Sequence, residues 1–152
     1  MSDNVYSVKQ SLNPENDPRK NQRIIQESQK GIARCLDKAE KAFSRAARIA
    51  LDNGFWAVAY NSFDDGTESL RQLMRILPWG HRKHLAMDAE AIFKEISWPG
   101  EVGNSLDLSS LLVESSKALN AISRFRNLWE ADCIATSITE GTLYGEEAVR
   151  ND

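Results

Sequence analysis

The chain has 152 residues, of which 41% are apolar and 27% are charged, and its formal net charge is −3. This length and composition are typical of one globular domain that buries a core without disulfides or a structural metal. No run approaches the roughly 18 apolar residues of a membrane span, and the polar N-terminal residues do not resemble a secretory signal, so we expect a cytoplasmic protein without membrane contact.

Residues 1–18 contain Pro14 and Pro18 among Asn, Asp and Ser, and we expect them to form a disordered or partner-ordered arm. From residue 19 the apolar spacing predicts one long helix to about residue 52, which ends at Asp52-Asn53-Gly54. The residues expected on its buried side are Ile24, Ile32, Cys35, Leu36, Ala39, Ala42, Phe43, Ala46, Ile49 and Ala50.

Basic residues occupy the opposite side of this predicted helix, on an arc roughly 100° wide. This basic face consists of Arg19, Lys20, Arg23, Lys30, Arg34, Lys38, Lys41, Arg45 and Arg48. Only three acidic residues lie in the same segment, so it carries +6 while the remainder of the chain carries −9. Such a polarised chain favours an anionic partner that approaches one side.

A solvated helix face is the alternative interpretation of the same pattern. Glu27 and Asp37 stand at helical spacing from basic neighbours and could pair with them. The basic face could also pair with the acidic remainder of the same fold or of a sister subunit. Solvated faces usually mix the two signs of charge, whereas this one has a three-to-one excess of basic residues, and the sequence leaves the binding, solvation and pairing interpretations open.

The middle of the chain predicts three shorter helices. Residues 55–63 are apolar and aromatic and favour a helix. Their alternation of larger apolar side chains with smaller or polar ones would also suit a short strand. Asp64-Asp65-Gly66 interrupts the pattern and predicts a cap for a second helix over 67–77. Residues 82–96 predict a third, with Leu85, Ala89, Ile92, Phe93 and Ile96 on its apolar side.

Two turns of similar composition, Leu77-Pro78-Trp79-Gly80 and Ser97-Trp98-Pro99-Gly100, flank that third helix. The pair could be an internal repeat, or two independent helix ends in which Pro and Gly stop the helix and Trp covers the core. If Trp79 or Trp98 is exposed instead, it would anchor a partner.

A second long helix is predicted over residues 106–138. Its apolar side consists of Leu108, Leu111, Leu112, Ala118, Leu119, Ile122, Phe125, Trp129 and Cys133. Arg126 lies within this side, where it could extend out between helices, form a specificity pair inside the fold, or contact a ligand or partner. Weak periodicity predicts a frayed tail over 140–152. The sequence therefore predicts an all-α, single-domain bundle of about five helices over 19–139.

Catalytic motifs are scarce. His81, His84 and Asp88 have a spacing that metal ligands can use, but no fourth ligand is near in sequence, so a surface cluster is favoured. Cys35 and Cys133 predict buried thiols and no disulfide. No phosphate-binding loop or nucleophile elbow occurs. We therefore expect that the protein binds no metal and no cofactor and is not an enzyme.

Arg75 and His81, with five residues between them, resemble the Arg-then-His motif of the helical HEPN ribonucleases. That resemblance implies RNA cleavage by a small helical nuclease. In this chain Pro78 and Gly80 fall between the two residues and should break the helix on which that family presents them.

We therefore expect a binding protein: an adaptor, an inhibitor or an assembly subunit that contacts an acidic protein surface or a second copy of itself. The expected contact residues are Arg23, Lys30, Arg34, Lys38, Lys41, Arg45, Arg48, Trp79, Trp98 and Arg126. The alternative is a helical module that binds a nucleic-acid backbone. In size and helical content the chain is similar to the small subunits of RNA-guided effector complexes.

Overall fold

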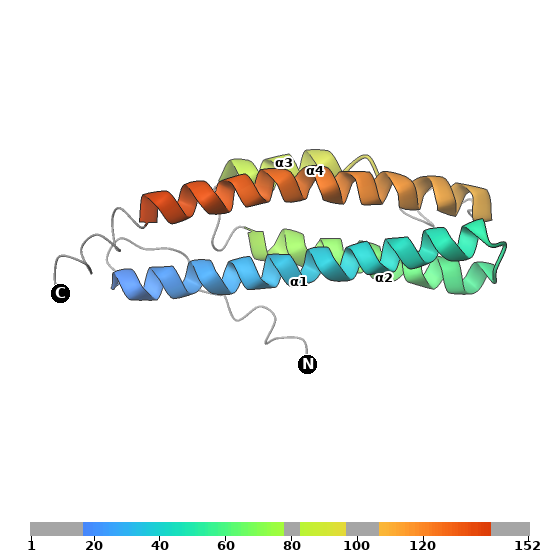
Figure 1. Ribbon diagram of the computed structural model, residues 1–152, viewed down its shortest axis with the longest axis horizontal. Coiled ribbons are helices and arrows are strands. Elements are labelled where there is room, and N and C mark those ends of the chain that lie inside the picture. The colour runs from blue at the N-terminus through green and yellow to red at the C-terminus, as the bar shows by residue number, and fades with distance from the viewer. Residues whose placement is uncertain (1–16, 78–82, 97–106, 141–152) are drawn as a thin grey trace.

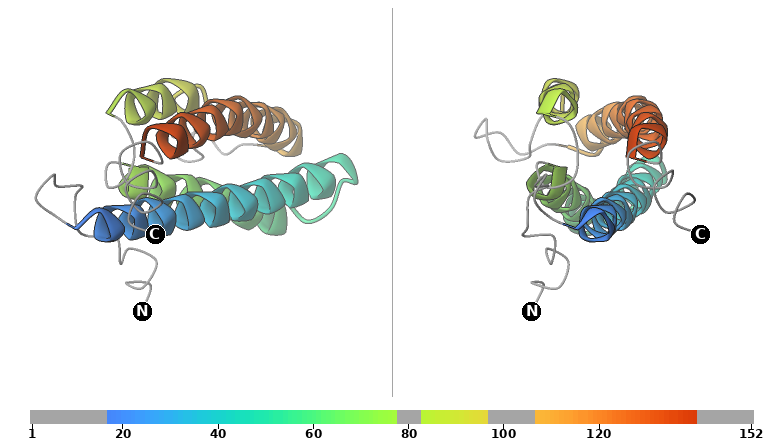
Figure 2. Two further views of the ribbon diagram at one scale, coloured as in Figure 1. Left: turned by 60° about the vertical axis from the view of Figure 1, so that its left-hand side comes forward. Right: turned by 90° about the vertical axis from the view of Figure 1, so that its left-hand side faces the viewer.

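The computed structural model describes residues 17–77, 83–96 and 107–140. They form four helices: α1 (Pro18–Leu51), α2 (Trp56–Ile76), α3 (Lys83–Phe93) and α4 (Leu108–Glu140). The helices run alternately in opposite directions along one axis (Figure 1). Viewed from the end they occupy the corners of a square, and α1 lies between α2 and α4 (Figure 2). The predicted all-α bundle with two long helices is confirmed, whereas most of the predicted arm and tail lies outside the described residues.

Both ends of α1 carry residues that favour helix termini. Asp17 caps the first turn by accepting a hydrogen bond from the Arg19 backbone N–H (2.9 Å), and Pro18 takes the first helical position. The predicted stop at Asp52-Asn53-Gly54 is confirmed. There the Gly54 N–H donates to the Ile49 carbonyl (2.8 Å), and Asn53 has a positive φ of 53°. This arrangement is the Schellman motif that closes many helices.

The predicted break at Asp64-Asp65-Gly66 is wrong, because α2 continues through these residues as one helix. Gly66 is buried against the Phe43 ring of α1, and a Cβ on Gly66 would lie 2.7 Å from Phe43 Cζ. Gly66 therefore allows α1 and α2 to approach closely and does not end the helix. The same continuity rules out the strand alternative for residues 55–63 and gives four helices within the described ranges where the pattern predicted about five.

The core lies where the apolar patterns predict it. Phe43 of α1 meets Phe63 of α2 edge-on at 5.1 Å between ring centroids, and Phe93 of α3 meets Phe125 of α4 at 5.3 Å. Every residue predicted on the apolar sides of α1, α3 and α4 is buried or half-buried. No helix among the described residues has an apolar stretch long enough to cross a membrane.

Candidate functional site

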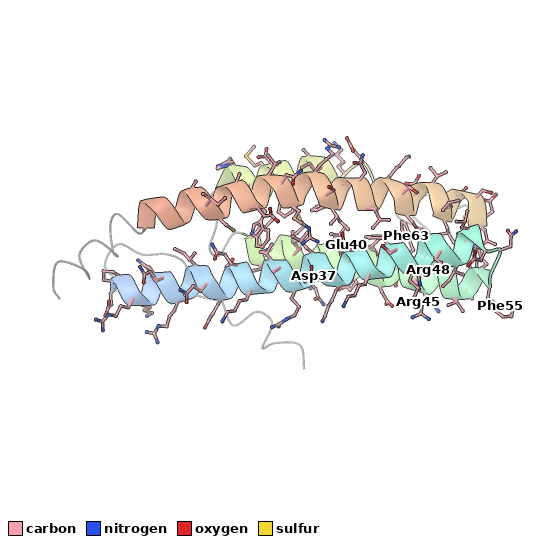
Figure 3. The ribbon with its side chains drawn as sticks, in the orientation of Figure 1. Asp37, Glu40, Arg45, Arg48, Phe55 and Phe63 are labelled. Carbon is pink, nitrogen blue, oxygen red and sulfur yellow. The ribbon has the colours of Figure 1, made fainter. Side chains whose placement is uncertain are left out.

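The basic face defined above lies on the outside of the bundle. Eight of its nine side chains are exposed, and Lys20 is half-buried. In Figure 3 nitrogen-tipped side chains project from the side of α1 that faces away from α4. From Arg19 to Arg48 the row spans about 44 Å at 1.5 Å per residue. Within the described ranges, none of the nine lies within ion-pair distance of a carboxylate.

Two of the three acidic residues of this segment face α4. Asp37 and Glu40 each accept from the Arg126 guanidinium, at 3.5 Å from Nη1 and 3.5 Å from Nη2 respectively. The carboxylate of Asp37 is therefore directed toward α4, where the sequence allowed pairing with Arg34 or Lys41. Asp37 and Glu40 thus link α1 to α4, and no residue of the basic face forms an ion pair with a described carboxylate.

Arg126 is 26% exposed at its side chain. Its guanidinium extends out between α1 and α4 to these two carboxylates, so the contacts share features of two of the three interpretations, the side chain that extends out between helices and the ion pair within the fold. Both carboxylates are more than half exposed, so the cluster lies at the surface of the α1–α4 seam and water screens it.

Four apolar side chains are exposed at the turn between α1 and α2, next to the C-terminal end of the basic face. We call this group the apolar tip: Leu51 (68% exposed), Phe55 (83%), Trp56 (40%) and Val58 (39%). Figure 3 shows Phe55 at the outer end of this hairpin, whereas Phe63 lies inside the bundle. Sequence reasoning missed the tip because it read residues 55–63 as one apolar stretch. One signal was available, since Leu51 lies about 130° from the centre of the apolar arc of α1.

The remaining predicted site residues are the two turn tryptophans and the cluster of His81, His84 and Asp88. Trp79 and Trp98 lie outside the described residues, as does His81. His84 is exposed on α3, and its Nε2 lies 3.9 Å from Oδ1 of Asp132, which is buried in α4. His84 is thus directed toward α4. No group of three His, Cys, Asp or Glu side chains that could hold a metal ion occurs in the described part of the chain.

A groove of about 540 Å³ separates α2 from α3. Arg71, Arg75, Glu90 and Lys94 line it together with Leu70, Met74 and Phe93. Leu70 and Phe93 are almost wholly buried, so Met74 and the stems of the charged side chains supply most of the accessible apolar wall. Arg75, the residue of the ribonuclease resemblance, is therefore exposed at a groove of mixed charge.

Both cysteines are free, as the sequence predicts. Burial raises the pKa of the Cys35 thiol, although Lys38 and Arg34 oppose the shift. Burial raises the pKa of Cys133 to about 11, and the neighbouring carboxylates of Asp132 and Glu130 add to the shift. Because the thiolate is the reactive form, neither side chain is suited to act as a nucleophile near neutral pH.

The described residues thus form a four-helix bundle with one basic edge and an apolar tip. Comparison with known proteins finds no family model, no curated protein and no solved structure that matches this chain.

Proposed function

We propose that the protein is a non-enzymatic binding protein, an adaptor, inhibitor or assembly subunit, whose basic face contacts an acidic protein surface. The observation that carries the proposal is the row of exposed basic side chains on α1 without ion-pair partners among the described residues. Asp37 and Glu40, which could have neutralised part of the row, are held by Arg126. Charges placed in this way accelerate encounter and set the register of a complex.

A protein partner is favoured over nucleic acid by what adjoins the basic face. Leu51 and Phe55 are exposed next to its C-terminal end, and the backbone of a nucleic-acid duplex presents mainly charged and polar groups to such side chains. The part of the chain outside 19–48 carries −9, so a second copy also presents acidic surface, and self-association belongs to the proposal. We place the protein in the cytoplasm, which its two free cysteines support.

Binding of a nucleic-acid backbone is the second candidate, as in a small subunit of a nucleoprotein complex. The straight row of about 44 Å supports it, because a rigid line of point charges can contact successive phosphates. Such binding would be independent of sequence and steeply dependent on salt.

Fluorescence anisotropy with two labelled polyanions of equal charge, poly-L-glutamate and oligo(dT), tests the proposal at about 50 and about 500 mM salt. We expect tighter binding of poly-L-glutamate, lost at the higher salt. The triple substitution Lys38→Gln, Lys41→Gln and Arg45→Gln should weaken it about tenfold, if each contact contributes about 0.5 kcal/mol.

The matched control changes three exposed basic residues away from α1, namely Arg71→Gln, Arg75→Gln and Lys94→Gln. It alters the net charge equally, and we expect it to leave the affinity within about twofold of wild type. Equal losses in both variants would mean that net charge, and not the basic face, governs binding. Tighter binding of oligo(dT) would select the second candidate, and absence of binding to either polymer at low salt would overturn both.

A further inference from the structure

The apolar tip departs from two local rules at one residue. Phe55 occupies the N-cap of α2 with extended backbone (φ −65°, ψ 123°), and its side chain makes no capping hydrogen bond. Ser, Thr, Asp or Asn would stabilise the helix at this position. The same Phe55 side chain is 83% exposed. A residue that supplies no capping hydrogen bond and leaves most of its ring in solvent is expected where a partner supplies the contact.

The hydrogen bonds of the turn fix the position of the tip. The Asn53 N–H donates to the Ala50 carbonyl (3.3 Å), which together with the Gly54 bond completes the Schellman motif. A Cβ at Gly54 would lie 2.8 Å from Ile49 Cγ2, so the turn packs closely on α1. On the other side, the backbone N–H groups of Val58 and Ala59 both donate to the Phe55 carbonyl (3.1 Å).

Of the two aromatic side chains of the tip, Trp56 is supported by a contact within α2. Trp56 packs against Tyr60 one turn later, with 4.9 Å between ring centroids. An anchor already held in its binding geometry loses little conformational entropy on association. Trp, Tyr and Arg are the residue types most enriched among those that dominate binding energy.

The charges beside the tip define the chemistry of the partner. Arg45 and Arg48 stand on the last two turns of α1, and Arg48 is one turn before Leu51. Both are exposed without an ion-pair partner among the described residues. A complementary site must therefore combine an apolar pocket for Phe55 and Leu51 with carboxylates at its border.

We propose that the apolar tip is the anchor of the complex and inserts into a carboxylate-bordered apolar pocket on a partner protein, while the basic face steers the approach. This inference rests on the proposed function, because it adds the anchor to the same surface. Phe55 and Leu51 enter the pocket, and Arg45 and Arg48 pair with its border.

The test compares poly-L-glutamate with a random copolymer of glutamate and tyrosine of equal length, both labelled for anisotropy. The first polymer offers carboxylates alone and the second offers carboxylates beside aromatic groups. We expect the full chain to bind the copolymer about tenfold more tightly, the effect of burying one large apolar side chain. Phe55→Ser should reduce this preference to less than about twofold without changing the affinity for poly-L-glutamate.

A thermal melt controls for folding, because Phe55→Ser supplies a capping hydroxyl and should not lower the melting temperature. Leu51→Gln gives a second variant whose side chain stays compatible with helix. Equal affinity of the wild type for the two polymers, or a preference that both variants retain, would overturn the inference and leave the proposed function standing. Failure to bind poly-L-glutamate at all would instead overturn the proposed function.

Two further measurements on the same variants test whether something other than a partner protein binds the apolar tip. If the protein alone forms a dimer by light scattering, and Phe55→Ser abolishes it, a second copy binds the apolar tip. That result would overturn the proposed pocket on a partner protein. Binding to phosphatidylserine vesicles that is tighter than binding to the copolymer and depends on Phe55 would overturn it in favour of a lipid surface.

Discussion

Phe63 and Phe55 belong to the same helical hairpin and carry the same side chain, but their surroundings are opposite. Phe63 is 0% exposed and packs edge-on against Phe43, whereas Phe55 is 83% exposed at the end of the hairpin. Burial of apolar surface is the main source of folding stability, so the first residue holds the bundle together and the second does not. The same side chain can therefore stabilise the fold at position 63 and leave its apolar surface exposed at position 55.

The largest effect expected from this comparison is the loss of Phe63. Phe63→Ala removes a buried ring and leaves a cavity between α1 and α2, which should lower the free energy of unfolding by about 3–5 kcal/mol. Phe55→Ala, the matched control, should change it by less than about 0.5 kcal/mol. Urea unfolding followed by circular dichroism measures both. Similar losses in the two variants would mean that the tip is packed in solution.

A smaller loss is expected at Gly66. In Gly66→Ala the added methyl meets the buried Phe43 ring, while alanine improves helix propensity by about 1 kcal/mol. The steric term should prevail and give a net loss of about 1–2 kcal/mol in the free energy of unfolding. Phe43→Leu in the same background should relieve the clash, so a double-mutant cycle should show coupling between the two positions. Independent, additive effects would contradict the contact.

At the apolar tip we expect a substitution to raise the free energy of unfolding, whereas those at Phe63 and Gly66 should lower it. Phe55→Ser replaces an exposed ring by a capping hydroxyl at the N-terminus of α2, which should raise the free energy of unfolding by about 1 kcal/mol. The same change should weaken binding to the glutamate–tyrosine copolymer. Stability would then rise while affinity for the copolymer falls. A fall in both would mean that Phe55 contributes to the stability of the bundle as well as to binding.

The smallest effect is expected at Arg126, where α1 joins α4 near the surface. Arg126→Gln removes two ion pairs whose carboxylates are more than half exposed, so it should lower the free energy of unfolding by about 0.5–1 kcal/mol. The difference from wild type should shrink at about 500 mM salt because exposed charges are screened. A loss that is indifferent to salt would mean that packing, and not charge, dominates at this position.

Apolar periodicity was sufficient to predict the class of fold and the buried sides of the helices, because the core of a bundle selects residues at helical spacing. It failed at Gly66, since a glycine that ends a helix and one that admits a neighbouring ring have the same sequence signal. It also failed at the tip, because periodicity does not show whether Phe55 has anything to pack against. The pairing of Asp37 with Arg126 joins residues 89 positions apart and depends on the assembled fold.

The most direct test of the account is two-dimensional NMR of the isotope-labelled protein, with amide resonances followed during titration with poly-L-glutamate and then with the glutamate–tyrosine copolymer. We expect poly-L-glutamate to shift the amides of α1 near the basic face, and the copolymer to shift in addition those of residues 51–58. Shifts confined to α3 and α4, or spread evenly over the bundle, would contradict the assignment of binding to the basic face and the apolar tip.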